Sequence, residues 1–71
     1  MTRDAAERIT RQLLAATHAL NEALTLVQTE CPSSFFNQYR RHAGHVLGSI
    51  YLDLIKPVVE RYPDLDPGRE E

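Results

Sequence analysis

Three histidines are the first residues whose types and spacing could support chemistry. His42 and His45 are three residues apart, so in a helix their side chains share one side, and His18 lies one helical turn before Glu22. A metal site needs three or four converging ligands, and the H-E-x-x-H pattern of catalytic zinc helices is absent. We therefore predict surface histidines, no metal site and no cofactor. The alternative is that two His42/His45 pairs meet across a dimer axis.

A basic stretch in the middle of the chain could bind an anion. No acidic residue occurs from position 31 to position 52, and the candidate anion-binding residues of this interval are Arg40, Arg41, His42 and His45. They could hold a phosphate or an acidic segment of a partner, or they could form ordinary solvated surface. The formal net charge of -2 and the lack of a helix-turn-helix pattern argue against nucleic acid as a partner.

The single cysteine, Cys31, excludes a disulfide within the chain. A catalytic cysteine needs a base nearby, and no histidine is close to Cys31 in the sequence. No glycine-rich phosphate loop or nucleophile elbow occurs either, so we predict that the protein is not an enzyme. A lone cysteine without a secretory segment predicts a cytoplasmic protein. No apolar run approaches the ~18 residues of a membrane span, so no membrane partner is expected.

The elements that position these residues are two helical segments joined by a short breaker. Apolar residues step by three and four from about Arg3 to Glu30, with Thr2 as a candidate N-cap, which predicts one long helix. Residues 31–34 read "CPSS", where Pro32 ends the first helix and a serine can cap the next. The link is short enough to make the helices antiparallel neighbours. The predicted fold class is therefore all-α, an antiparallel helical hairpin.

The second helix is expected from about Phe35 to Tyr62, with a kink at Pro57 or, as the alternative, a short break and restart there. On a wheel of 100° per residue, one side of it faces the first helix, and that side includes Leu47, Leu54 and Val58. A second apolar side would lie open, and its residues are the predicted dimer interface: Gly44, Gly48, Tyr51, Leu52, Ile55 and Val59.

Two apolar sides cannot both be covered by one partner helix, and each large apolar side chain left in water forfeits roughly 1.5–3 kcal/mol. We therefore predict a homodimer in which two hairpins form a four-helix bundle. Gly44 and Gly48 would let a second backbone approach closely, by analogy with G-x-x-x-G contacts in membranes. The alternative is that these glycines accommodate bulky side chains of the first helix.

The segment from Tyr39 to Pro67 has a Tyr-Arg-Arg start, glycines four apart, an aliphatic-acidic run, a proline, and the end "RYPDLDP". It resembles a group of short uncharacterised bacterial helical proteins, which implies a bacterial origin and no particular activity. We expect a helical hairpin domain over residues 1–62 and a flexible acidic tail over residues 63–71. The expected function is that of a small homodimeric protein-protein interaction or regulatory protein with an unidentified partner. The alternative is an anion- or nucleic-acid-binding module that uses the basic stretch.

Overall fold

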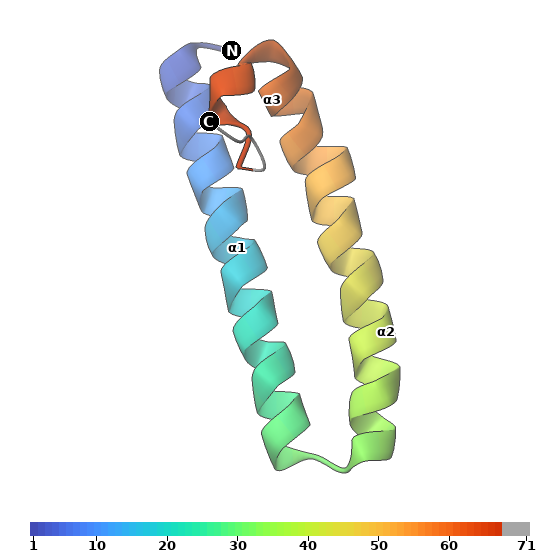
Figure 1. Ribbon diagram of the computed structural model, residues 1–71. Helices are drawn as coiled ribbons and strands as arrows, with labels where there is room; N and C mark the ends of the chain where they lie inside the picture. The colour runs from blue at the N-terminus through green and yellow to red at the C-terminus, as the bar shows by residue number, and fades with distance from the viewer. Residues whose placement is uncertain (68–71) are drawn as a thin grey trace.

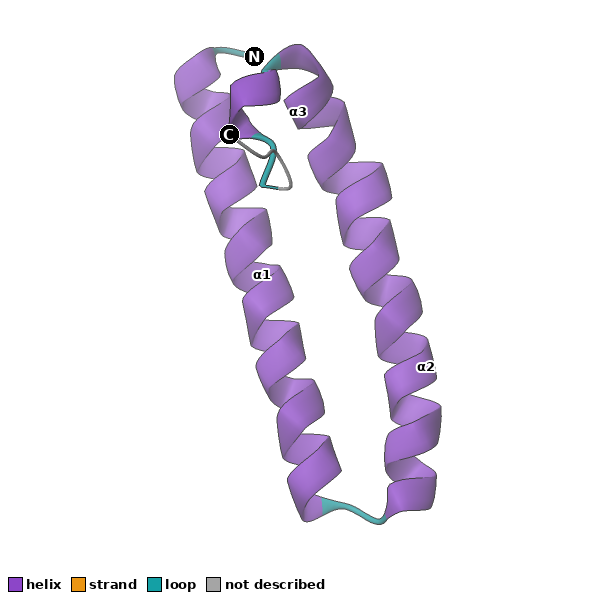
Figure 2. Ribbon diagram, in the orientation of Figure 1, coloured by secondary structure: helices purple, strands orange, loops and turns teal. Residues whose placement is uncertain are grey.

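Two long helical arms lie side by side in the computed structural model, which describes residues 1–67 (Figure 1). The first arm is helix α1, Arg3–Glu30, and the second consists of α2, Ser33–Ser49, the π-helix η1, Ile50–Ile55, and α3, Lys56–Arg61. A 3-10 helix, η2, Pro63–Leu65, follows. No strand occurs in the part of the chain that the structure describes (Figure 2). The predicted all-α hairpin is confirmed, whereas its assembly into a bundle stays a prediction.

Helix α1 begins where the sequence predicts. The Thr2 side-chain oxygen accepts a hydrogen bond from the Ala5 N–H at 3.1 Å and caps the helix. At ~1.5 Å per residue its 28 residues span about 42 Å, close to the 45 Å length of the whole molecule. The expectation that a serine caps α2 is wrong: Pro32 occupies the N-cap position, and α2 begins at Ser33 without a side-chain cap.

The second arm changes its hydrogen-bond pattern just before Pro57. A π-helix is characterised by hydrogen bonds that span five residues, and the Lys56 N–H at the end of η1 donates to the Tyr51 carbonyl. Proline has no N–H, and in an α-helix its ring would clash with the carbonyl four residues back, that of Asp53. A π turn, which is wider than an α-helical turn, would relieve that clash. The irregularity expected at Pro57 therefore takes the form of a π turn that precedes it.

The π turn rotates every later side chain relative to a regular helix. The residues of the second arm that face α1 are spaced by four, three, five and three: Ala43, Leu47, Ile50, Ile55 and Val58. The step of five spans η1. As a result Ile55 is 2% exposed and Val59 is buried, whereas Leu54 is 52% exposed. The sequence-based placement of Leu54 inside the hairpin, and of Ile55 and Val59 on its open side, is wrong for this reason.

The best-packed part of the core lies at the open end of the hairpin, where both η1 and α3 contact α1. The buried apolar residues are Ala6, Ala43, Ile55, Val58 and Val59. Toward the turn the residues between the arms are half-buried, such as Leu24 and Val27. The radius of gyration is 14.5 Å, against about 11 Å for a compact domain of this length.

The chain after α3 folds back over the open end (Figure 1). Arg3 donates a hydrogen bond to the carboxylate of Asp64, and the Tyr62 hydroxyl donates to the Met1 carbonyl at 2.8 Å. The hydrogen bond and charge of Asp64 raise the pKa of Arg3. Part of the predicted flexible tail thus forms η2 and contacts α1, and residues 68–71 of that tail lie outside the described residues.

Candidate interaction surface

One side of the hairpin is lined by apolar side chains from both arms. We call it the apolar face and define it by Ile9, Leu13 and Leu20 of α1 together with Tyr39, Val46, Ile50 and Leu54 of the second arm. A hollow of about 210 Å³ joins the two arms, and its lining includes Leu20, Tyr39 and Val46. Because Leu13 and Leu20 are two helical turns apart, Leu13 projects from the same side of α1 as Leu20.

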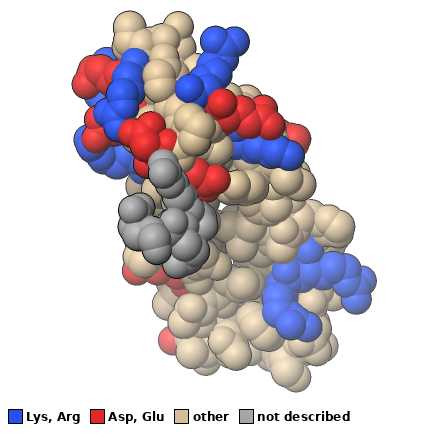
Figure 3. All heavy atoms as spheres, turned by 45° about the horizontal axis from the view of Figure 1, so that its top comes forward, with Lys and Arg blue, Asp and Glu red and all other residues tan. Residues whose placement is uncertain are grey.

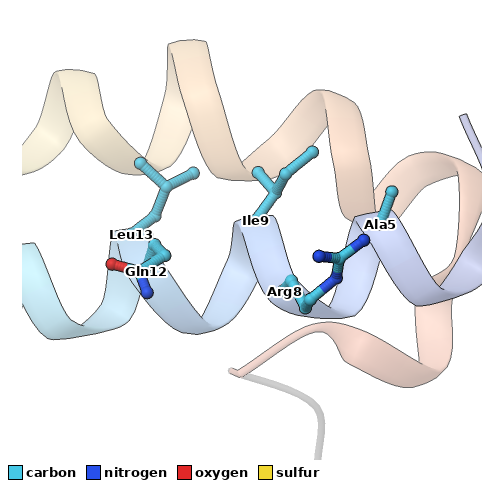
Figure 4. Close-up of a pocket in the computed structure, with 5 residues that line it drawn as sticks. All are labelled: Ala5, Arg8, Ile9, Gln12 and Leu13. Carbon is cyan, nitrogen blue, oxygen red and sulfur yellow. The ribbon is translucent and has the colours of Figure 1, made fainter.

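Two larger grooves continue this face toward the open end. One, of about 420 Å³, shares Val46 with the central hollow and is lined further by Ile50, Leu54 and Asp53. The other, of about 410 Å³, lies along α1, where Ile9 and Leu13 project toward the second arm (Figure 4). Ile9 is 41% exposed and Val46 51% exposed, so the face offers large apolar groups to solvent.

The apolar face exists because the apolar stripe of α1 is not centred on the second arm. Thr10 is buried and Thr17 half-buried between the arms, whereas Ile9 and Ala16 are exposed beside them. The Thr17 hydroxyl donates to the Leu13 carbonyl at 3.0 Å, which satisfies it within the helix. Ile9 and Ala16 belong to the pattern of apolar residues that predicts this helix, and that pattern leaves out the two threonines, because a polar residue type is not expected between packed helices.

The predicted dimer interface is divided by the structure. We call the exposed part, made of Gly44, Gly48, Tyr51 and Leu52, the glycine face. A Cβ atom added at either glycine would meet no atom within 4 Å. The glycines therefore do not accommodate side chains of α1, and that alternative is wrong.

Ile55 and Val59, the other two residues of the predicted interface, are buried within a single chain and face α1. They cannot contact a second copy without opening the hairpin, so their assignment to the interface is corrected. The glycine face is also partly flanked by the returning chain, because Tyr51 hydrogen-bonds Asp66 at 3.5 Å. Leu52, 58% exposed, is the most exposed large apolar side chain of the glycine face.

The candidate anion-binding residues Arg40, Arg41, His42 and His45 are all exposed. Successive residues of a helix are 100° apart, so Arg40 and His42 project in nearly opposite directions, about 160° apart. The two histidines line grooves of the apolar face. Figure 3 shows basic side chains over α2 with no acidic side chain beside them on the face in view. The arrangement is a broad basic region and not a single converging pocket.

The remaining candidates for chemistry lie apart from one another. His18 pairs with Glu22 at 3.3 Å on the exposed side of α1, one turn apart, as its sequence position indicates. Cys31 is half-buried at the turn. Residues 1–67 contain no group of three or more histidine, cysteine, aspartate or glutamate side chains that could hold a metal ion. The possible meeting of His42 and His45 pairs across a dimer axis stays a prediction.

Comparisons of the chain with protein-family models, with curated proteins and with solved structures find no match. The resemblance to short bacterial helical proteins therefore stays a prediction. None of the helices among the described residues is long and apolar enough to span a membrane. The fold and surface together define an all-α helical hairpin that leaves apolar side chains of both arms exposed.

Proposed function

We propose that this chain is a small interaction protein that works as a homodimer, with two hairpins packed into a four-helix bundle and no catalytic activity of its own. In this proposal the bundle is a cytoplasmic scaffold or regulator whose surface binds another protein. The fold is suited to such a role, because two antiparallel arms with a shared apolar face can associate through side chains alone, without rearrangement of the backbone.

The observation that supports the proposal is the amount of surface that one hairpin leaves in water. A folded monomer of 8.1 kDa is expected to expose about 4,500 Å². This chain exposes 5327 Å². The difference is about 800 Å², which is what each partner contributes to a protein interface of standard size. Contact with a second copy over such an area would bring the exposed area of each chain to about the value expected of a folded monomer of this mass.

Sedimentation velocity over a dilution series tests the homodimer. We expect a species of twice the 8.1 kDa chain mass that dissociates on dilution. The helix content measured by circular dichroism should stay constant over the concentrations at which the dimer is present. A fully helical monomer at every concentration up to the solubility limit would contradict the proposal. In that case the apolar face would have to be covered by a different protein.

The second candidate function is an anion-binding module, favoured by the basic side chains over α2 that have no acidic neighbour in Figure 3. Binding to heparin or to a short phosphorylated peptide would then weaken with salt and would be lost in the Arg40→Ala/Arg41→Ala double variant. Both arginines are exposed, so the substitutions should leave the fold intact. Indifference of the wild-type protein to polyanions at low salt would exclude this candidate.

A further inference from the structure

We propose that the second copy of the chain packs on the apolar face and not on the glycine face. The inference rests on the proposed homodimer and deepens it, because it assigns the contact to a particular set of residues. The occupant is a second hairpin, whose own apolar face meets the first in a two-fold symmetric contact.

The first argument is the orientation of α1. The side of α1 that faces the second arm includes two threonines, Thr10 and Thr17, while Ile9 projects about 100° from Thr10, on the apolar face. An isolated hairpin would be expected to turn its isoleucine inward and its threonines outward. The observed orientation places α1 between two packing partners, one in the same chain and one opposite the apolar face.

The second argument compares what α1 contributes to each side of the hairpin. Its side next to the apolar face carries apolar residues at steps of three and four: Ile9, Leu13, Ala16, Leu20 and Ala23. Its side next to the glycine face carries mostly polar residues at the same steps: Glu7, Arg11, Leu14, His18, Asn21 and Thr25. The apolar face therefore receives a continuous apolar stripe from α1, whereas Leu14 is the one large apolar residue in the polar row beside the glycine face. A four-helix bundle core requires apolar surface from both arms, so the apolar face fits it better.

The third argument is the charge at the edge of the apolar face. Arg8 borders the groove on α1, and Asp53 borders the groove on the second arm. Counted from the turn at Cys31, the two residues lie at nearly the same height. If each α1 packs antiparallel on the second arm of the other copy, Arg8 of one copy comes next to Asp53 of the other, twice in the dimer. The charges at the rim of the apolar face are thus complementary between two copies in this arrangement.

The returning chain disfavours the glycine face as the seat of a second hairpin. Gly44, Gly48 and Tyr51 form one row of the helix, and the Tyr51 end of this row is hydrogen-bonded to Asp66. A close backbone approach along the whole row would have to displace this segment. The apolar face has no such contact among the hydrogen bonds of the described residues.

Two matched pairs of glutamate variants test the assignment. On the second arm, Val46→Glu is compared with Gly48→Glu, because both positions are exposed and two residues apart. On α1, Ile9→Glu is compared with Leu14→Glu, since both side chains are about 40% exposed and lie on opposite sides of the helix. Each pair adds the same charge, and circular dichroism verifies that each variant keeps its helix content.

We expect Val46→Glu and Ile9→Glu to raise the dimer dissociation constant about 30-fold or more in sedimentation velocity, as for a central interface residue. Gly48→Glu and Leu14→Glu should remain within about threefold of the wild type. If instead the glycine-side variants dissociate the dimer, or if all four behave alike, the apolar-face assignment is overturned while the homodimer stands. A monomeric wild-type protein would overturn both. If Val46→Glu loses helicity, Leu54→Glu replaces it, because Leu54 is 52% exposed in the single chain.

Discussion

Substitution of Ile55 by alanine should destabilise this protein far more than substitution of its neighbour Leu54. Ile55 is the largest fully buried side chain, at 2% exposure, whereas Leu54 is 52% exposed. A regular α-helical wheel predicts the opposite order, because it places Leu54 between the arms and Ile55 outside them. The π turn of η1 reverses the two residues, so their ranking tests the most unusual feature of the backbone.

The expected magnitudes follow from burial. Truncation of a buried isoleucine to alanine costs about 2–5 kcal/mol, and we expect about 3 kcal/mol at Ile55. A core of this size supplies only about 3–5 kcal/mol in total, so Ile55→Ala should be close to unfolded without denaturant. With an m value of about 1 kcal/mol per M urea, the midpoint should fall by about 3 M. Leu54→Ala should cost less than about 1 kcal/mol in the single chain.

The assay is urea unfolding followed by far-UV circular dichroism. The protein should be dilute enough that the urea midpoint no longer depends on protein concentration. Under that condition any contribution of Leu54 to a dimer contact drops out of the free energy of unfolding. Leu52→Ala, at a position 58% exposed, serves as the control for removing an exposed leucine from the same turn. A larger loss for Leu54→Ala than for Ile55→Ala would refute the π-helical register.

Four further substitutions probe other parts of the hairpin. Gly44→Ala and Gly48→Ala should each raise the free energy of unfolding by about 1 kcal/mol in urea titrations, because alanine favours the helix and open space lies at both positions; unchanged or lower stability would contradict this. Thr10→Val should raise the free energy of unfolding by about 1 kcal/mol, since the buried Thr10 hydroxyl makes no hydrogen bond within the described residues. A marked loss of stability would contradict this and would indicate that the hydroxyl has a hydrogen-bond partner. Asp64→Asn should speed limited proteolysis after Arg61, because it weakens the attachment of η2 to Arg3. Asp64 raises the pKa of Arg3, so the stabilising contribution of Arg3 should stay constant across neutral pH and be lost only in strong alkali. The measurement is the difference in free energy of unfolding between the wild type and Asp64→Asn at pH 6 and at pH 9, and a change of this difference between the two pH values would contradict the expectation.

Much of the fold follows from local signals in the sequence. The spacing of apolar residues and the Thr2 cap predict α1 with its observed ends, and Pro32 predicts the turn. The register of the second arm beyond Ile50 could not be predicted in this way. A periodicity argument assumes 100° per residue, and one π turn adds a residue that the pattern of apolar types does not reveal.

The candidate surface was predicted only in part. The sequence shows that the second arm is apolar on more than one side, and Leu52 and Tyr51 are indeed exposed. The contribution of α1 was overlooked, because its alanines and Ile9 fit a core stripe as well as a surface stripe. Thr10 and Thr17 distinguish a core stripe from a surface stripe on α1. They are seven residues apart, and each lies three residues before a leucine, Leu13 or Leu20. Their spacing places them between the arms whatever their polarity.

The contacts that join Met1 to Tyr62 and Arg3 to Asp64 bring the two ends of the described chain to the same place. A pulling force applied at these ends would separate the arms by peeling, one helical turn after another, and would not slide them past each other. The first turns to part would be those around Ile55 and Val58, where the packing is densest. Once the turns around Ile55 and Val58 have separated, Ala43 is the one buried apolar residue left between them and the turn, and the other contacts there are half-buried. Mechanical resistance in a single hairpin is therefore concentrated at the open end.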